Sequence, residues 1–269
     1  MIREAFEWLL TPCPRARRDL GYLSETIAIG ARQRRCRTAW AEHLSRSRQA
    51  ILGAARSAPG RRTVVVLGSG PLLDVPLAEL AAQFHSVILV DALHPLTARL
   101  EARRHVNVEL VTADLTGALE ALHRWQPGER LPAPQPLALL QRDDIDFVVS
   151  LNLLSQLGVL PVEWIEKRAG PPGPALAEAY AADLTRAHLA DLARCPAPVC
   201  LVADVEWWRQ QPDGRIVERA STIYEVPAPP AIAEWIWAIA PAPESDPRLS
   251  EYRRVIVTLD PGKTGQSAG

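Results

Sequence analysis

A glycine turn followed by an aspartate is the feature of this sequence that points most directly to chemistry. The turn, Gly68-Ser69-Gly70-Pro71, comes directly after an apolar run at 63–67. Because glycine has no Cβ, the backbone of such a turn can approach a ligand closely. Asp91 stands about twenty residues past the turn, at the end of a second apolar run, where a carboxylate can accept hydrogen bonds from ribose hydroxyls. The pattern predicts a site for a ligand that contains a nucleoside.

Polar side chains also follow two further expected strands. The run 106–111 leads into Asp114, and the run 146–151 leads into Asn152. Strands that are apolar throughout are typical of a parallel sheet buried on both faces. Ligands of open α/β sheets bind at the carboxyl edge, where such strands end together. We therefore expect these side chains to line one site.

The loop after the glycine turn argues against a dinucleotide. A G-x-G-x-x-G fingerprint requires glycine at position 73, where this chain has Leu73. We expect Asp74 to cap the next helix, with Pro76 in its first turn. The helix then begins too late to pack closely around a pyrophosphate, so NAD is disfavoured.

In their order and spacing these residues resemble the class I S-adenosylmethionine-dependent methyltransferases, over roughly residues 60 to 205. The resemblance implies a Rossmann-like α/β fold: a mostly parallel sheet of seven strands with an antiparallel C-terminal edge strand, flanked by helices. It also implies S-adenosyl-L-methionine as the cofactor and methyl transfer as the activity. The acceptor is not identified by any motif.

The resemblance implies a role for each of these loops. The glycine turn would pass under the methionine part of the cofactor, the acid after the second strand would hold the ribose, and the acid after the third would contact the adenine. The segment after the fourth strand would close over the cofactor and contribute to the substrate side. The cofactor-binding residues implied in this way are Gly68, Ser69, Gly70, Asp91, Ala92, Asp114, Leu115, Leu151 and Asn152.

Two alternatives stay open. The Gly-Ser-Gly-Pro-Leu turn also resembles that of nicotianamine synthase, which transfers an aminocarboxypropyl group from the same cofactor. The chain is otherwise a candidate for a non-catalytic cofactor-binding module. No residue is singled out as catalytic, because in-line transfer of an already activated methyl group depends mainly on alignment, and a general base adds less.

Positive charge is concentrated near the N-terminus. Residues 1–62 hold 13 arginines and 5 acids, although the whole chain has a net charge of −1. Arg32, Arg34, Arg35 and Arg37 form the densest group and are candidates for contact with RNA or another anionic partner. A solvated helix face that packs on the acidic body is the favoured interpretation of the same cluster.

Helical periodicity predicts an N-terminal helical cap at 1–58, followed by the methyltransferase-like domain at 59–260 and a flexible tail at 261–269. Extended segments at 221–226 and 252–259 are expected to supply the antiparallel edge of the sheet. Trp235 and Trp237 between them are expected to fill the core, with the wall of a substrate pocket as the alternative.

The expected location is cytoplasmic, because the N-terminus lacks the features of a secretory signal and no apolar run is long enough to span a bilayer. The four cysteines have no C-x-x-C spacing, and the six histidines have no H-x-x-x-H spacing. Free thiols and the absence of a metal site are therefore expected.

Overall fold

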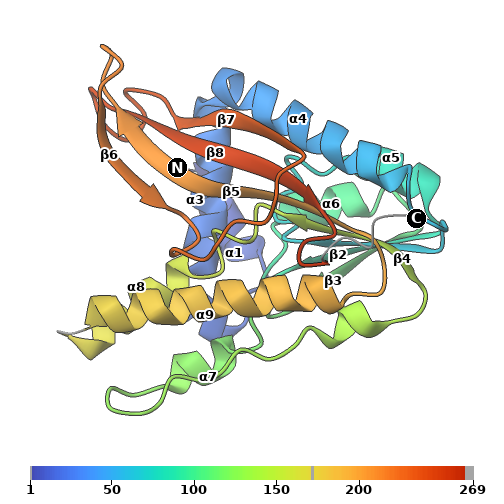
Figure 1. Ribbon diagram of the computed structural model, residues 1–269, viewed down its shortest axis with the longest axis horizontal. Coiled ribbons are helices and arrows are strands. Elements are labelled where there is room, and N and C mark those ends of the chain that lie inside the picture. Colours follow the sequence, from blue (N-terminus) through green and yellow to red (C-terminus); the bar gives the residue numbers. More distant parts are fainter. Residues whose placement is uncertain (1, 171–172, 264–269) are drawn as a thin grey trace.

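The computed structural model describes residues 2–170 and 173–263 (Figure 1). The helices are α1 (Ile2–Leu10), α2 (Arg15–Asp19), α3 (Tyr22–Arg35), α4 (Arg37–Ala55), α5 (Leu77–Gln83), α6 (Leu96–Ala102), α7 (Leu119–Arg124), the 3-10 helix η1 (Ala138–Gln141), α8 (Val159–Ala169) and α9 (Gly173–Arg194). The strands are β1 (Thr63–Leu67), β2 (Ser86–Asp91), β3 (Val108–Thr112), β4 (Ile145–Leu151), β5 (Val199–Gln210), β6 (Ile216–Ser221), β7 (Ala233–Ala240) and β8 (Ser250–Leu259).

One sheet organises the molecule, in the order β3-β2-β1-β4-β5-β8-β7, with β6 paired to β5 outside this path. Strands β1 to β5 pair in parallel, whereas β8 runs antiparallel to both β5 and β7. The strand order reverses between β1 and β4, so their carboxyl ends flank a switch point. This is the sheet of the class I methyltransferase fold, and the predicted fold class is confirmed.

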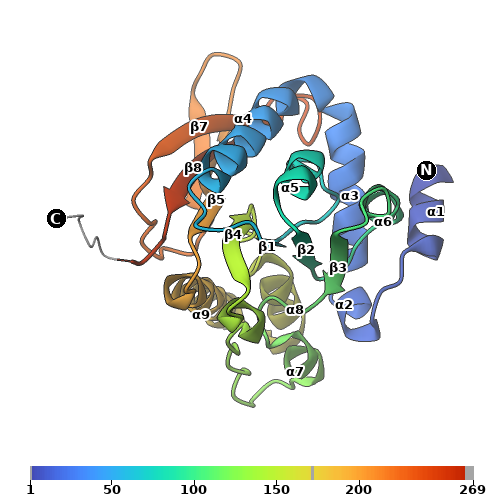
Figure 2. The same cartoon turned by 90° about the vertical axis from the view of Figure 1, so that its right-hand side faces the viewer.

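Helices cover both faces of the sheet (Figure 2). Side chains of a strand alternate between faces, so Val64 and Val66 of β1 pack with α4 and α5, while Val65 and Leu67 pack with α7, α8 and α9. All five residues of β1 are buried. The all-apolar pattern at 63–67 is therefore explained by burial on both faces.

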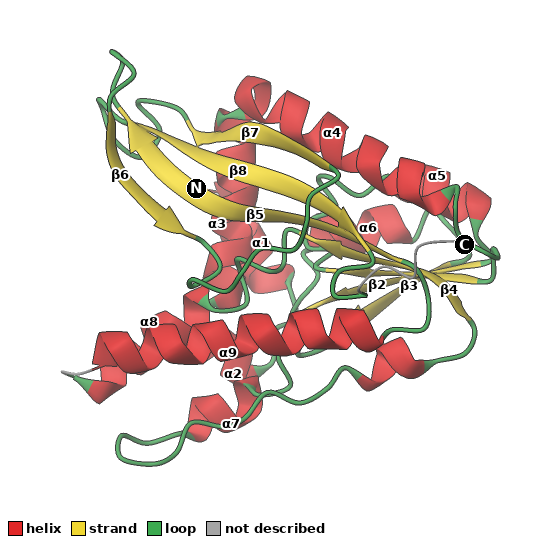
Figure 3. Ribbon diagram, viewed as in Figure 1, coloured by secondary structure: helices red, strands yellow, loops and turns green. Residues whose placement is uncertain are grey.

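The antiparallel end of the sheet is larger than predicted (Figure 3). Strand β5 has 12 residues and extends past the parallel region, where it pairs with both β6 and β8. The strand predicted at 221–226 is wrong, because β6 ends at Ser221. Tyr224 and Glu225 have positive φ angles, and the hydroxyl of Ser221 accepts hydrogen bonds from the backbone of Ile223 and Glu225, so this segment turns.

The N-terminal segment is helical, and its last helix, α4, lies against β5 and β7. Trp40 of α4 is 3% exposed and donates a hydrogen bond from Nε1 to the carbonyl oxygen of Ile239 in β7, at 2.8 Å. Trp235 and Trp237 of β7 are buried in the same core cluster, as predicted. The four cysteines are free. Within 2–170 and 173–263, no helix has the length and apolar character needed to cross a bilayer.

Candidate binding cleft

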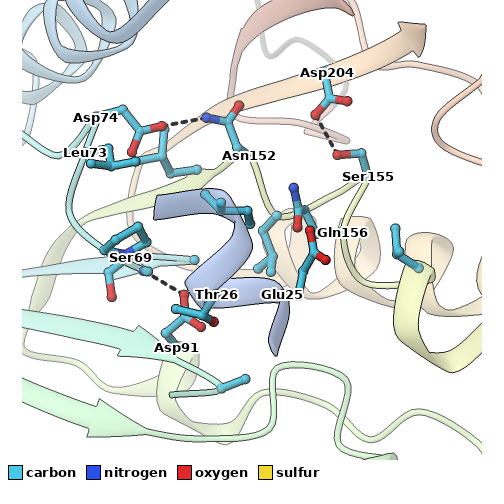
Figure 4. A pocket seen from close by; sticks show the side chains of 18 of the residues that line it. Glu25, Thr26, Ser69, Leu73, Asp74, Asp91, Asn152, Ser155, Gln156 and Asp204 are labelled. Atoms are coloured by element: carbon cyan, nitrogen blue, oxygen red, sulfur yellow. Dashed lines mark hydrogen bonds between the residues drawn. The ribbon is translucent and has the colours of Figure 1, made fainter. Parts of the chain in front are cut away.

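A cleft of about 280 Å³ opens at the carboxyl edge of the sheet, beside the switch point (Figure 4). Its floor comes from the loops after β1, β2, β3 and β4, and α3 and α4 supply the opposite wall. The strand-end residues that line it are Gly68, Ser69, Gly70, Asp91, Ala92, Leu115, Thr116, Leu151 and Asn152. The fold therefore brings together the loops that the sequence analysis singled out.

Both glycines of the turn have left-handed backbone conformations, with φ of 78° at Gly68 and 44° at Gly70. A Cβ at Gly68 would stand 2.6 Å from the carbonyl oxygen of Leu151, at the end of β4. Residue 68 thus has to be glycine for two independent reasons, its φ angle and its contact with β4. The close contact joins the turn to the loop after β4 and leaves the turn's backbone open to the cleft.

Asp91 is held beside this turn. The amide of Gly70 donates a hydrogen bond to Asp91 Oδ2 at 2.7 Å, which fixes the carboxylate at the end of β2. Burial raises the pKa of Asp91 to about 6, although hydrogen bonds from nearby amides lower it in part. The next residue is held as well, because buried Arg17 of α2 donates to the carbonyl oxygen of Ala92 at 2.6 Å. The arrangement offers a fixed carboxylate to a ligand with hydroxyl donors.

Asp114 has a different environment from the one expected. Its Oδ1 accepts hydrogen bonds from the amide and the hydroxyl of Thr116, both at 2.8 Å, and its Oδ2 accepts one from the amide of Leu119 at 2.7 Å. The carboxylate thus closes the loop that leads into α7. Asp114 lines a smaller neighbouring cavity, whereas Leu115 lines both. Contact between Asp114 and an adenine stays a prediction.

A buried histidine supports the turn from behind. His94 is 4% exposed, and its Nε2 lies 3.2 Å from the hydroxyl of Ser69 while its Nδ1 lies 3.3 Å from the hydroxyl of Thr112. Burial lowers the pKa of His94 to about 4. A neutral ring here links the glycine turn to the end of β3, so His94 positions the turn.

The end of the cleft farther from Asp91 contains a second polar group. Asn152 Nδ2 donates to Asp74 Oδ2 at 2.6 Å and lies 3.4 Å from His43 Nε2. The predicted helix cap at Asp74 is wrong: α5 begins at Leu77, its N-cap is Pro76, and no side chain caps it. Asp74 instead faces β4 because Asn152, with a positive φ of 46°, turns its amide toward the loop.

Aromatic side chains from α4 and β7 form the wall near this group. The rings of His43 and Trp237 stack with centroids 3.9 Å apart, and Trp40 meets Trp237 edge-on at 4.8 Å. Trp235 Nε1 donates to His43 Nδ1 at 3.2 Å. Burial lowers the pKa of His43 to about 3, so the ring is neutral.

Another carboxylate in the cleft is already paired. Ser155 donates to Asp204 Oδ1 at 2.5 Å, and Arg253 donates to Asp204 Oδ2 at 3.2 Å. In Figure 4 this pair lies apart from Asp91, with Glu25 and Gln156 between them. Asp204, at the carboxyl end of the parallel part of β5, therefore lies in a part of the cleft that is separate from Asp91.

Sequence reasoning missed the residues contributed by the N-terminal helices. Tyr22, Glu25 and Thr26 of α3 line the cleft, as do Trp40 and His43 of α4. Their periodicity predicted helices but held no information about which part of the sheet these helices cover. No local motif marks them.

The arginine cluster is largely paired within the chain. Arg34 Nη2 lies 2.5 Å from Glu4 Oε1, and Arg35 Nη2 lies 2.5 Å from Glu244 Oε1, while Arg32 Nε lies 3.9 Å from the same oxygen. Arg37 is exposed. These contacts agree with a helix face packed on acidic residues, and a nucleic-acid partner stays a prediction.

No family model and no curated protein sequence matches this chain. Among solved structures, the N-methyltransferase NodS from Bradyrhizobium japonicum WM9, in complex with S-adenosyl-l-homocysteine, is 10% identical with a TM-score of 0.38, covering 81% of this chain and 87% of NodS. The 1,6-didemethyltoxoflavin-N1-methyltransferase from Burkholderia thailandensis is 14% identical with a TM-score of 0.39, and 92% of each chain is covered.

These likenesses are remote, so the fold assignment rests on the strand order. The order and the cleft at its switch point define an α/β protein of the class I methyltransferase fold. Among the described residues, no group of three or more His, Cys, Asp or Glu side chains is arranged to hold a metal ion.

Proposed function

We propose that this protein binds S-adenosyl-L-methionine in the cleft and transfers its methyl group to an acceptor. One observation carries the proposal: Asp91 is fixed by the amide of Gly70 beside a turn whose first glycine leaves no room for a Cβ. A carboxylate and an open backbone side by side fit a ligand with a ribose next to an amino-acid tail. The solved likenesses that contain S-adenosylhomocysteine agree with this choice.

The residues of the chain have separate tasks in this proposal. Asp91 accepts hydrogen bonds from the ribose, the turn at Gly68 and Gly70 lies against the methionine part, and Leu115 contacts the base. Leu151 and Asn152 close the side of the cleft that leads to the acceptor. These contacts hold the ligand in one orientation.

The bound ligand supplies a methyl group on a positively charged sulfur. The methyl carbon is already activated, so alignment of the acceptor, worth about 7 to 11 kcal/mol, outweighs other contributions. Helices α3 and α4 cover the cleft opposite the sheet and exclude water from it. The protein thus acts by orientation and enclosure.

Calorimetric titration tests this proposal. We expect micromolar binding of S-adenosylmethionine and S-adenosylhomocysteine and no binding of NAD, because the loop from Gly68 to Asp74 is too open for a pyrophosphate. Binding of NAD alone would contradict the proposal. The mass gained by an acceptor would then separate methyl transfer from aminocarboxypropyl transfer.

A further inference from the structure

We propose that the acceptor is an amine and that Asp74 accepts the proton that the amine loses as it is methylated. This inference rests on the proposed function and gives a role to the part of the cleft around Asp74. It follows from the position of Asp74, from the charges around it and from the aromatic side chains of the cleft wall near it.

Asp74 is positioned for this role by a neighbour on the sheet. Asn152 follows β4, next to the contact between Leu151 and Gly68, and donates to Asp74 Oδ2 at 2.6 Å. An acceptor has to meet the methyl group where the ligand passes the glycine turn. Asp74 lies in the loop that continues from this turn, and it lines the cleft there together with Leu73 and Asn152 (Figure 4).

The charges in the cleft favour a cationic group. Arg253 is paired with Asp204, and Arg32 lies 3.9 Å from Glu244. Neither Asp74 nor Glu25 forms an ion pair with another residue that the structure describes. Two carboxylates thus face the cleft without a bound cation, and Trp40 and Trp237 line it nearby. Carboxylates together with electron-rich rings are a typical environment for an ammonium group.

His43 is not a competing base. Its Nδ1 accepts the hydrogen bond from Trp235, and burial lowers its pKa to about 3. By contrast, burial raises the pKa of Asp74 to about 6, against the opposing effects of a backbone hydrogen bond, the hydrogen bond from Asn152 and the charge of Arg48 in α4. The groups around Asp74 are therefore neutral Asn152 and His43 and one cation, Arg48, whose guanidinium donates to the carbonyl oxygen of Leu73.

The transfer step balances with these groups. An ammonium acceptor first releases one proton to bulk water as it enters the cleft and so becomes a neutral amine. The amine nitrogen then forms a bond to the methyl carbon, the carbon–sulfur bond breaks with its electron pair left on sulfur, and one proton of the methylated nitrogen passes to the Asp74 carboxylate. No oxidant, reductant or metal is required.

The test uses sinefungin, an analogue in which a carbon bearing an amino group replaces the sulfonium and its methyl. Its ammonium stands where methyl and acceptor meet. Calorimetry should show that the full chain binds sinefungin at least about tenfold more tightly than S-adenosylhomocysteine near pH 7.5, which corresponds to about 1.4 kcal/mol. In Asp74→Asn this preference should disappear while the affinity for S-adenosylhomocysteine stays within about twofold.

Asp183→Asn is the matched control, since Asp183 is exposed on α9 and forms an ion pair with Arg186 at 2.8 Å. It should leave the preference intact. The preference should also decline below about pH 6, where Asp74 takes up a proton. If Asp74→Asn binds both ligands as the natural chain does, Asp74 has no such role although the proposed function stands. If the natural chain binds neither ligand, the proposed function fails, and this inference with it.

Discussion

The chemistry of single residues in the cleft is set by hydrogen bonds that already exist within the chain. Asp91 is oriented by the amide of Gly70, and Asp74 is held by the amide of Asn152. Both carboxyls have their pKa raised to about 6 by burial. A ligand that donates hydrogen bonds to such a carboxylate stabilises its ionised form and so offsets the cost of burying the charge.

The first prediction concerns Asp91→Asn. The change removes the charge and one acceptor while it keeps the shape, so we expect at least a tenfold loss of affinity for S-adenosylhomocysteine, about 1.4 kcal/mol. In the natural chain the affinity should rise with pH through about 6 as Asp91 ionises. Calorimetry across this range measures both effects. Equal affinity in Asp91→Asn and in the control Asp183→Asn would exclude a ribose contact.

The second prediction separates the two constraints on Gly68. Gly68→Ala introduces both left-handed strain and a contact with the Leu151 carbonyl, whereas Gly128→Ala, at φ of 93° with open space, introduces the strain alone. Strain of this kind costs about 1 to 2 kcal/mol. Urea unfolding should show a clearly larger loss of stability for Gly68→Ala, together with lost ligand binding. Similar losses in the two variants would mean that the turn does not depend on β4.

At the residue scale, sequence predicted the strand-end positions well and their contacts poorly. Gly68, Asp91 and Asn152 line one cleft because parallel strands end at one edge. Asp74 does not cap the helix as expected but faces the cleft, and the carboxylate of Asp114 accepts hydrogen bonds within its own loop. The direction of a side chain in a loop depends on neighbours that are distant in sequence. The spacing of residues along the chain does not reveal which neighbours these are.

Among the elements, α4 and β7 decide how the cleft is closed. In α4, Trp40 and His43 pack on Trp235 and Trp237 of β7. Along the chain, strands β1 to β6 lie between these two elements. The sequence predicted the helix from its helical period, and the apolar run of the strand was visible separately. It did not predict that the two pack together, because any apolar helix face can cover any apolar sheet face.

A third prediction tests this packing. Trp40→Phe keeps most of the ring but leaves the Ile239 carbonyl without its donor, so we expect a loss of about 1 kcal/mol or more in the free energy of unfolding. Trp8→Phe in α1, where the side chain is 40% exposed, should change stability by less than about 0.5 kcal/mol. Equal losses for the two variants in urea unfolding would show that the α4–β7 hydrogen bond does not contribute to the free energy of unfolding.

For the whole molecule, the fold class was the most predictable property. A parallel sheet with a switch point follows from apolar runs separated by helices, and the antiparallel end follows from the fold class. The length of β5 and the presence of β6 were not foreseen, because exposed strands such as Ile216–Ser221 have no long apolar run to mark them.

The fourth prediction is a loss of stability on acidification below about pH 6.5. His43, His94 and His188 have their pKa lowered by burial to about 3, 4 and 4, so the unfolded chain binds protons that the folded chain does not. The raised pKa values of Asp74 and Asp91 act in the opposite direction between about pH 6 and 4, but their shifts are smaller.

Scanning calorimetry from pH 7.5 to 5 measures this dependence as a falling Tm. His188→Gln should flatten the pH dependence, because burial disfavours the protonated form of His188 and glutamine does not take up a proton in this range. His85→Gln, at an exposed position, should leave it unchanged. A Tm that rises on acidification would show that the carboxyl groups dominate.

The most direct test is a crystal structure of the chain with S-adenosylhomocysteine. It should show the two ribose hydroxyls on the carboxylate of Asp91, the amino-acid tail along Gly68 to Gly70, and the sulfur directed toward Asn152 and Asp74. A ligand bound elsewhere, or a cleft left empty at saturating concentration, would contradict the central claim that this edge of the sheet is a nucleoside site.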